Sequence, residues 1–164
     1  NVAVVLNDER GVPETSERSN TRLRRERLLR GRAAQARLVP LYAPADQPEA
    51  MLEALEDGLK PYLPISVLLL GMGADMHTAS LFPGADRLEE ALSASAPILL
   101  PMRAEAAGEP RITLTARTLR EAFNIHVLIT GPDKRAALER AMTLTPMEAP
   151  VRAVLDNATV HWAE

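Results

Sequence analysis

An apolar run that ends in a glycine-rich turn constrains the fold of this chain most. Residues Val67–Leu70 are uninterrupted aliphatic side chains, and Gly71 and Gly73 follow directly. A short apolar run bounded by glycine predicts a strand buried on both faces, as in a parallel sheet. In open α/β sheets, ligands bind just beyond the carboxyl ends of such strands. The sequence therefore predicts a functional site directly after residue 70.

Apolar β-type runs alternate with helical patterns along the rest of the chain. We expect strands within segments 1–6, 36–42, 67–70, 97–102, 111–115, 125–130 and 159–163. We expect helices within segments 21–32, 46–60, 116–122, 134–142 and 151–155. Segment 7–20 is polar and contains glycine and proline, which predicts a loop. This alternation predicts an α/β protein with a mainly parallel sheet.

Length and composition exclude several classes of protein. A chain of 164 residues fits one domain that spans residues 1–164, and a net charge of −3 gives no general argument for nucleic acid or an anionic membrane. Cysteine is absent, which excludes disulfides and thiolate zinc sites. We expect a cytoplasmic protein, monomeric or weakly homo-oligomeric. Because the chain opens on Asn1 and enters a strand at once, we also expect that a front portion is missing.

The expected helix 21–32, for which either Ser19 or Asn20 is the expected N-cap, lies in an arginine-rich region. Eight arginines fall between Arg18 and Arg37. Such a cluster is typical either of a nucleic-acid patch or of a solvated helix face. No aromatic residues are interleaved with these arginines and the whole chain is acidic, so we favour the solvated face.

The turn after residue 70 contains the side chains best suited to chemistry. Asp75 is two residues from His77, and Thr78 and Ser80 supply hydroxyl groups. A carboxylate can orient an imidazole and raise its basicity, and histidine suits general-base catalysis near neutral pH. A metal site is disfavoured because no cluster of further ligands is evident. A capped turn without catalytic function is the alternative.

Two cations begin the expected helix 134–142. Lys134 and Arg135 fall in its first turn, where the helix dipole is positive and cations typically cost about 0.3–1 kcal/mol. An anion bound at this end would explain the arrangement. Alternatively, both cations point away from the helix end and Asp133, the expected cap, partly offsets them.

Several motifs together resemble those of one enzyme family. Residues 71–84, GMGADMHTASLFPG, closely resemble the signature of the 6-phosphogluconolactonases. Residues 8–13 (DERGVP) with 19–20 (SN), residues 110–115 (PRITLT), and Gly131 with Lys134 resemble further family motifs in the same order. The resemblance extends over essentially the whole chain.

The resemblance implies a fold, a reaction and catalytic roles. The fold is the three-layer α/β/α sandwich shared with glucosamine-6-phosphate deaminases and ribose-5-phosphate isomerases. The reaction is hydrolysis of 6-phosphogluconolactone to 6-phosphogluconate in the oxidative pentose phosphate pathway. His77 would be the general base that activates water, and Asp75 would orient His77 or handle a proton when the ring oxygen leaves. Asp8 would be an assisting acid, and the resemblance implies no metal or organic cofactor.

The resemblance also implies contacts to the substrate, a sugar-phosphate lactone. Arg111 and Lys134 would hold the phosphate through charge-assisted hydrogen bonds. Arg10 and Asn20 would be further substrate contacts. Backbone N–H groups around Gly71 and Gly73 would stabilise negative charge on the carbonyl oxygen.

Two departures from the family pattern bear on function. Met76 replaces the glycine that family members usually carry between the Asp and the His, and a positive φ there would strain the backbone by about 1–2 kcal/mol. The glycine- and serine-rich loop that cradles the sugar phosphate in family members has no counterpart here. Both departures favour an alternative hypothesis, an inactive or truncated relative that binds a sugar phosphate.

A second alternative is an amino-sugar-phosphate deaminase or isomerase. In the related deaminases an acid stands directly before the proline of this motif. Here that residue is Phe82, before Pro83. The missing acid would assist ring opening of an amino sugar, so the sequence favours the lactonase.

Overall fold

The computed structural model describes residues 2–164, and Asn1 of the first expected strand lies outside this range. The strands are β1 Ala3–Val5, β2 Asp8–Arg10, β3 Arg37–Val39, β4 Leu68–Gly71, β5 Leu99–Met102, β6 Arg111–Leu114, β7 Ile125–Thr130 and β8 Ala158–Ala163. The α-helices are α1 Asn20–Arg27, α2 Leu52–Leu59, α3 Leu88–Leu92, α4 Ala116–Arg120, α5 Pro132–Ala141 and α6 Arg152–Leu155. Short 3₁₀ segments occupy Gly31–Gln35, Pro48–Met51, Lys60–Tyr62 and Glu105–Ala107.

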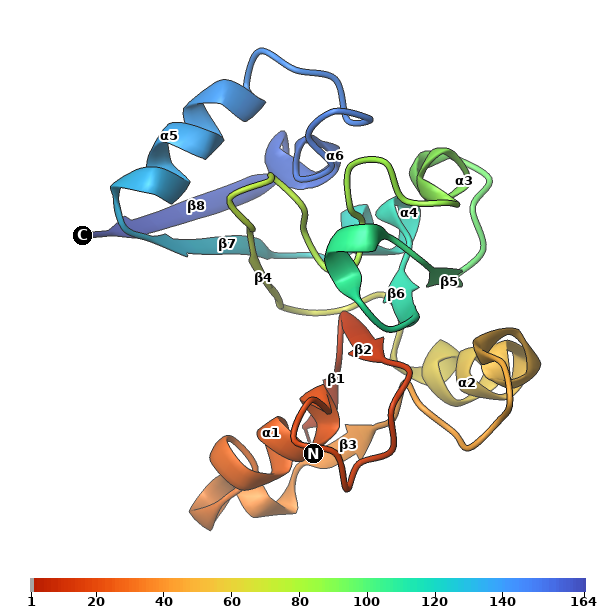
Figure 1. Ribbon diagram of the computed structural model, residues 1–164. Coiled ribbons are helices and arrows are strands. Elements are labelled where there is room, and N and C mark those ends of the chain that lie inside the picture. Colours follow the sequence, from red (N-terminus) through yellow and green to blue (C-terminus); the bar gives the residue numbers. More distant parts are fainter. Residues whose placement is uncertain (1) are drawn as a thin grey trace.

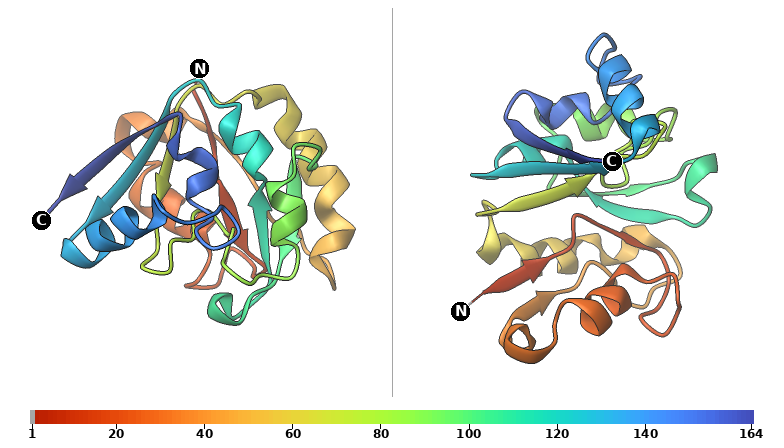
Figure 2. Two further views of the ribbon diagram at one scale, coloured as in Figure 1. Left: turned by 90° about the horizontal axis from the view of Figure 1, so that it is seen from above. Right: turned by 90° about the vertical axis from the view of Figure 1, so that its left-hand side faces the viewer.

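The described strands form three sheets (Figure 1). Strands β4, β7 and β8 form a parallel sheet with β7 in the middle, and β1 pairs with β3 in parallel. Strands β2, β6 and β5 form an antiparallel sheet with β6 in the middle. Helices α5 and α6 lie beside β7 and β8, whereas α1 lies beside β1 and β3 (Figure 2). The mixture of helices with mainly parallel strands confirms the predicted α/β class.

A groove separates the two parallel sheets. It has a volume of about 1360 Å³ and is lined by β1, by residues 61–69 and by parts of α1. The side-chain amide of Asn7 reaches across and donates to the carbonyl oxygen of Leu69, at 3.2 Å. Asp8, the first residue of β2, and Asn20, the first residue of α1, also line this groove. The groove therefore extends from β1 to two of the candidate site residues.

The antiparallel sheet brings the turn after β4 against β2. Asp8 of β2 is the register partner of Thr113 in β6, and Arg10 is the partner of Arg111. The hydroxyl oxygen of Thr113 accepts a hydrogen bond from the backbone N–H of Ser80, at 3.1 Å. The sheet therefore carries the candidate residues of segments 8–20, 71–84 and 110–115 to one place (Figure 1).

The burial predicted for β4 is wrong. Strand β4 is buried on one face only, because Leu68 and Leu70 lie in the core whereas Leu69 is 59% exposed. Leu128, on the neighbouring β7, is also exposed, so this face of the sheet is open within residues 2–164. Segment 111–115 alternates polar and apolar residues, yet all four residues of β6 are buried, because other parts of the chain cover both of its faces.

Segment 7–20 is not entirely a loop, because β2 lies within it. Three polar residues carry no strand pattern of their own, and β2 exists because it pairs with the distant β6. The local sequence signal is correct at the start of α1, where the side chain of Ser19 accepts a hydrogen bond from the backbone N–H of Arg22 as an N-cap. Helix α1 nevertheless ends at Arg27, earlier than expected.

The predicted cap of α5 is wrong. Gly131 is the N-cap residue, with φ of 83°, and Pro132 is the first helical residue. Proline suits this position because its fixed φ is already helical and its missing N–H would have had no partner. Asp133 therefore lies inside the first turn, where its charge still complements the helix dipole.

Within residues 2–164, no helix is both long and apolar enough to cross a membrane.

Candidate active site

The turn after β4 holds a carboxylate and an imidazole against each other. Asp75 Oδ1 lies 2.5 Å from His77 Nδ1 and also accepts the backbone N–H of His77, at 3.2 Å. When Nδ1 carries the proton and donates it to Asp75, the other ring nitrogen, Nε2, has a free lone pair. The His77 side chain is 31% exposed, so water can reach it. This arrangement can remove a proton from water.

Gly73 makes room for this pair. A Cβ atom at residue 73 would overlap both the His77 ring and the Asp75 carboxylate. The Gly73 N–H donates to the carbonyl oxygen of His77 at 3.0 Å, and its carbonyl oxygen accepts the N–H of Met76 at 2.9 Å. Because this N–H is already used, it is not free to bind a carbonyl oxygen of a substrate in this arrangement. The carbonyl oxygen of Gly71 accepts the Thr78 hydroxyl, at 2.8 Å, and closes the turn.

Met76 has the positive φ that the sequence analysis considered for the usual glycine position of the family. Its φ is 67°, and Ala79 also has a positive φ, of 50°. L-residues in this region carry a steric penalty of about 1–2 kcal/mol. The carbonyl oxygen of Met76 accepts the N–H of Val151, at 3.1 Å, directly before α6. The turn is therefore strained locally and anchored to a distant part of the chain.

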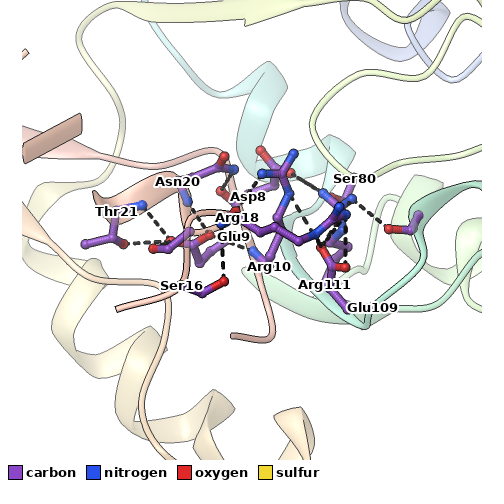
Figure 3. Close-up of polar contacts among 12 residues, drawn as sticks. Asp8, Glu9, Arg10, Ser16, Arg18, Asn20, Thr21, Ser80, Glu109 and Arg111 are labelled. Atoms are coloured by element: carbon purple, nitrogen blue, oxygen red, sulfur yellow. Dashed lines mark hydrogen bonds and ion pairs between the residues drawn. The ribbon is translucent and has the colours of Figure 1, made fainter. Parts of the chain in front are cut away.

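Asp8 lies in a buried polar environment (Figure 3). The hydroxyl of Ser80 donates to Asp8 Oδ2 at 2.7 Å, and Arg111 Nη1 lies 3.7 Å from the same oxygen. Burial raises the pKa of Asp8 above its ordinary value, while the Ser80 hydrogen bond and the charge of Arg111 act in the opposite direction. Asp8 thus favours its protonated form more than an exposed aspartate does.

Arg111 is buried and incompletely paired. Its Nη2 donates to the carbonyl oxygen of Ala107 at 2.9 Å and lies 3.9 Å from Glu109 Oε1. Its Nε has no hydrogen-bond partner among residues 2–164, and neither does Nε of Arg10. Burial lowers the pKa of Arg111, although a guanidinium stays charged in proteins. Each of these two guanidinium groups therefore keeps one buried donor that the described residues leave unsatisfied.

Glu109 is surrounded by three arginines (Figure 3). Arg18 Nη2 lies 3.0 Å from its carboxylate, Arg10 Nε lies 3.6 Å away, and Arg111 is third. Burial tends to raise the pKa of Glu109, but the Arg18 hydrogen bond, a backbone hydrogen bond and the nearby arginines outweigh it and lower this pKa. The cluster is therefore net positive.

Phe82 joins the two halves of the site. Its ring centroid lies 4.4 Å from that of His77, with an angle of 32° between the planes. Arg111 Cζ lies 5.8 Å from the same ring centroid. One buried ring thus contacts both the imidazole and the guanidinium, which places the proposed base and the cationic cluster in a single site.

Comparison with known proteins identifies the family. The family model described as glucosamine-6-phosphate isomerases/6-phosphogluconolactonase matches residues 1–162. The chain belongs to this family. The resemblance inferred from the motifs is therefore confirmed.

Members of the family cover nearly the whole chain. A 6-phosphogluconolactonase of Rhizobium meliloti is 44% identical over 99% of this chain and 73% of its own length. One of Mesorhizobium japonicum is 46% identical over 99% of this chain and 70% of its own length. The crystal structure of a 6-phosphogluconolactonase from Shewanella baltica superimposes with a TM-score of 0.94 at 32% identity, over 99% of this chain and 72% of that one. The chain spans about seven tenths of the length of these family members.

Most residues of this site come from the three family motifs in segments 8–20, 71–84 and 110–115. Asn20 joins the buried half because its Nδ2 donates to the carbonyl oxygen of Asp8, at 3.2 Å. Lys134 is half-buried in the first turn of α5, and no hydrogen bond or ion pair links it to the other candidates within residues 2–164. Its proposed contact to phosphate stays a prediction.

Sequence reasoning overlooked several participants. Ser80 was noted only as a hydroxyl, and Phe82 only as the replacement for a deaminase acid. Glu109 precedes the family motif at Pro110, so its position offered a weak signal. Glu9 lies between Asp8 and Arg10 in the family motif, but only those two residues were assigned roles from the sequence. No group of three or more histidine, aspartate or glutamate side chains suited to a metal lies within residues 2–164.

Proposed function

We propose that this chain hydrolyses 6-phospho-D-glucono-1,5-lactone to 6-phosphogluconate, as part of the oxidative pentose phosphate pathway. Family membership and relatives named 6-phosphogluconolactonase at 44% and 46% identity support this function. The observation that carries the proposal is the Asp75–His77 pair, which lies across the Phe82 ring from the buried Arg111 and its arginine cluster.

His77 acts as the general base in this proposal. Its Nε2 removes a proton from water while the water oxygen attacks the lactone carbonyl carbon. Asp75 holds the neutral tautomer and then stabilises the imidazolium. When the tetrahedral intermediate collapses, the bond between the carbonyl carbon and the ring oxygen breaks. The proton on His77 passes to the leaving ring oxygen, so the base is regenerated and 6-phosphogluconate is released.

The arginine cluster binds the phosphate in this proposal. Arg111 and Arg10 offer unused Nε donors, and a phosphate dianion accepts such charge-assisted hydrogen bonds strongly. Lys134 supplies a further cation, and Asn20 contacts the sugar. Glu109 competes with the phosphate for the same arginines, so substrate binding requires partial separation of these ion pairs.

Asp8 assists the reaction at the sugar. Because burial raises its pKa, Asp8 takes up a proton more readily than an exposed aspartate and can then donate a hydrogen bond to a hydroxyl or to the ring oxygen. The glycine turn supplies backbone donors near the carbonyl oxygen. The N–H of Gly73 is engaged with His77, so this role falls to the remaining amides around Gly71.

The decisive test is hydrolysis of freshly prepared 6-phosphogluconolactone by the wild type and by His77→Ala, after subtraction of the uncatalysed rate. General-base catalysis typically contributes 10²–10⁴-fold, so we expect His77→Ala to lose at least about 100-fold in kcat. Circular dichroism checks that both samples are folded. A folded wild type that only matches the uncatalysed rate would overturn the lactonase proposal.

The same samples test the alternatives. Met76, with its strained backbone, favours a sugar-phosphate-binding module without turnover. Such a module would bind 6-phosphogluconate in a calorimetric titration while the wild type shows no lactonase rate. A deaminase would release ammonia from glucosamine 6-phosphate. We expect no ammonia, because Phe82 occupies the place of the assisting acid.

The proposal includes a setting for the enzyme. We place it in the cytoplasm, as a monomer or weak homo-oligomer that acts on a sugar-phosphate lactone without nucleic acid or a membrane. Pairing of the arginines of α1 supports the solvated interpretation of that helix, because Arg22 binds Glu26 and Arg25 binds Glu14. Sedimentation velocity over a range of concentrations checks the oligomeric state.

A further inference from the structure

Glu9 is a buried carboxylate that no step of the proposed mechanism uses. It lies between Asp8 and Arg10 in β2 and is 0% exposed. Because successive side chains of a strand point to opposite faces, Glu9 points away from the face that carries Asp8 and Arg10. A substrate bound to those two residues therefore does not touch Glu9.

Five donors converge on the Glu9 carboxylate (Figure 3). Oε1 accepts the backbone N–H of Arg10 at 2.7 Å and that of Asn20 at 2.8 Å. Oε2 accepts the N–H and the hydroxyl of Thr21, both at 2.7 Å, and the hydroxyl of Ser19 at 3.2 Å. Every partner donates, which matches an ionised carboxylate because that group only accepts. Hydrogen bonds to a charged acceptor are the stronger kind.

These hydrogen bonds fasten the first turn of α1 to β2. Ser19 already caps α1 through the N–H of Arg22, so the helix has its own local cap. What Glu9 adds is a connection between two elements. A second hydrogen bond joins α1 to β2, because Asn20 Nδ2 donates to the carbonyl oxygen of Asp8 at 3.2 Å. The backbone of β2 and the start of α1 thus form one closed hydrogen-bonded unit.

This unit contains three of the proposed site residues. Glu9 holds the backbone of Arg10 and Asn20 directly, and the side chain of Asn20 in turn holds the carbonyl oxygen of Asp8. Ser80 and Arg111 approach Asp8 from other segments, so a shift of β2 would alter their distances to Asp8. A displacement of about 1 Å in a site residue can cost roughly 100-fold in rate, so such anchoring matters for activity as well as for stability.

We propose that Glu9 is a positioning residue for the lactonase reaction. It acts through Asp8, Arg10 and Asn20, and it rests on the function proposed above. Its loss is expected to affect substrate binding most, because Arg10 and Asn20 are proposed substrate contacts.

The test is steady-state kinetics of Glu9→Gln against the wild type. Glutamine keeps the shape but replaces one accepting oxygen with an NH₂ group that faces donors. We expect kcat/KM to fall at least about tenfold, mostly through a higher KM. The pH dependence of kcat should not move, because within residues 2–164 no hydrogen bond or ion pair joins Glu9 to Asp75 or His77. The control is Ile129→Val in the core of β7, a conservative change away from the site that should keep kcat and KM within about twofold.

A milder variant covers the case in which Glu9→Gln does not fold. Thr21→Val keeps the side-chain shape and removes only the hydroxyl donor to Oε2. We expect a rise in KM of about two- to fivefold, in proportion to one lost hydrogen bond. Wild-type KM and kcat in either folded variant would overturn the positioning role.

Failure of this inference is distinct from failure of the proposed function. A wild type without lactonase activity would overturn the latter, and Glu9 would then be judged by calorimetric binding of 6-phosphogluconate. Binding at least about tenfold weaker in Glu9→Gln would support the positioning role. Equal binding by both proteins, or no binding by the wild type, would overturn it.

Discussion

The two halves of the candidate site are held in place by different forces. The Asp75–His77 pair lies within one turn, its hydrogen bonds join residues two apart, and both side chains are partly exposed. Asp8 and Arg111 form the other half, which is buried and assembled from segments far apart in sequence. The hydrogen bond from Ser80 to Asp8 joins residues 72 apart.

The two halves differ in what opposes their formation, which is backbone strain in one and desolvation in the other. The turn carries backbone strain, since Met76 and Ala79 have positive φ. The buried half carries desolvation, since burial raises the pKa of Asp8 and lowers that of Arg111. Substitutions in the turn should therefore change catalysis more than stability, whereas substitutions in the buried half should change stability and binding as well.

The largest effect is expected for Asp75→Asn in the exposed half. An amide cannot stabilise the imidazolium of His77 and can favour the wrong tautomer, so kcat should fall by about 10²-fold or more. Because the side chain is 43% exposed, thermal stability should change little. Stopped-flow hydrolysis and a thermal melt measure both, with the exposed Asp46→Asn as control. A large loss of stability would contradict the division between the halves.

Arg111→Lys tests the binding role of the buried half. Lysine keeps the charge but lacks the planar fork of guanidinium donors. We expect KM for the lactone to rise about tenfold with a smaller change in kcat. Arg117→Lys, in which the partly exposed arginine of α4 is replaced, serves as the matched control and should be neutral. An unchanged KM in Arg111→Lys would argue that the phosphate binds elsewhere.

Ser80→Ala tests the desolvation of Asp8 through the pH dependence of the free energy of unfolding. The folded-state pKa of Asp8 is raised, so the contribution of Asp8 to stability is greatest at pH below the ordinary pKa value and decreases as pH rises through the raised pKa. Removing the Ser80 hydrogen bond raises this pKa further. We expect the variant to lose about 1–3 kcal/mol of unfolding free energy at pH 7.

The loss in Ser80→Ala should shrink at low pH, because protonated Asp8 no longer needs the hydrogen bond as an anion. Urea unfolding of both proteins at pH 7 and near pH 3.5 measures the difference. The exposed hydroxyl variant Ser93→Ala should show no such pH dependence. A loss in Ser80→Ala that is equal at both pH values would mean that the hydrogen bond does not act through the charge of Asp8.

The smallest effects are expected for the strained residues. Ala79→Gly relieves a positive φ and removes only a methyl group, so we expect a gain of about 0.5–1 kcal/mol. Met76→Gly relieves the same kind of strain but loses a side chain packed against the core, so its net change should stay below about 1 kcal/mol. Chemical denaturation compares the two variants. A clear rise in turnover of Met76→Gly would show that Met76 obstructs catalysis.

Much of this architecture follows from local signals. Apolar runs predicted β4 and β7, the Ser19 cap marked the start of α1, and the spacing of Asp75 and His77 identified a pair that the turn geometry brings into contact. These features depend on residues within one or two turns of each other, and such short-range preferences are written directly in the sequence.

Other features depend on the tertiary structure. Strand β2 exists only through its pairing with β6, and the partners of Asp8 and Glu9 come from distant segments or from a helix start. Burial likewise depends on what covers a strand, which is why Leu69 is exposed while all of β6 is buried. The sequence by itself determined most of the elements and the family, and it is the basis for proposing His77 as the base. Only the folded chain decided which groups lose their water, because desolvation depends on neighbours that no local pattern specifies.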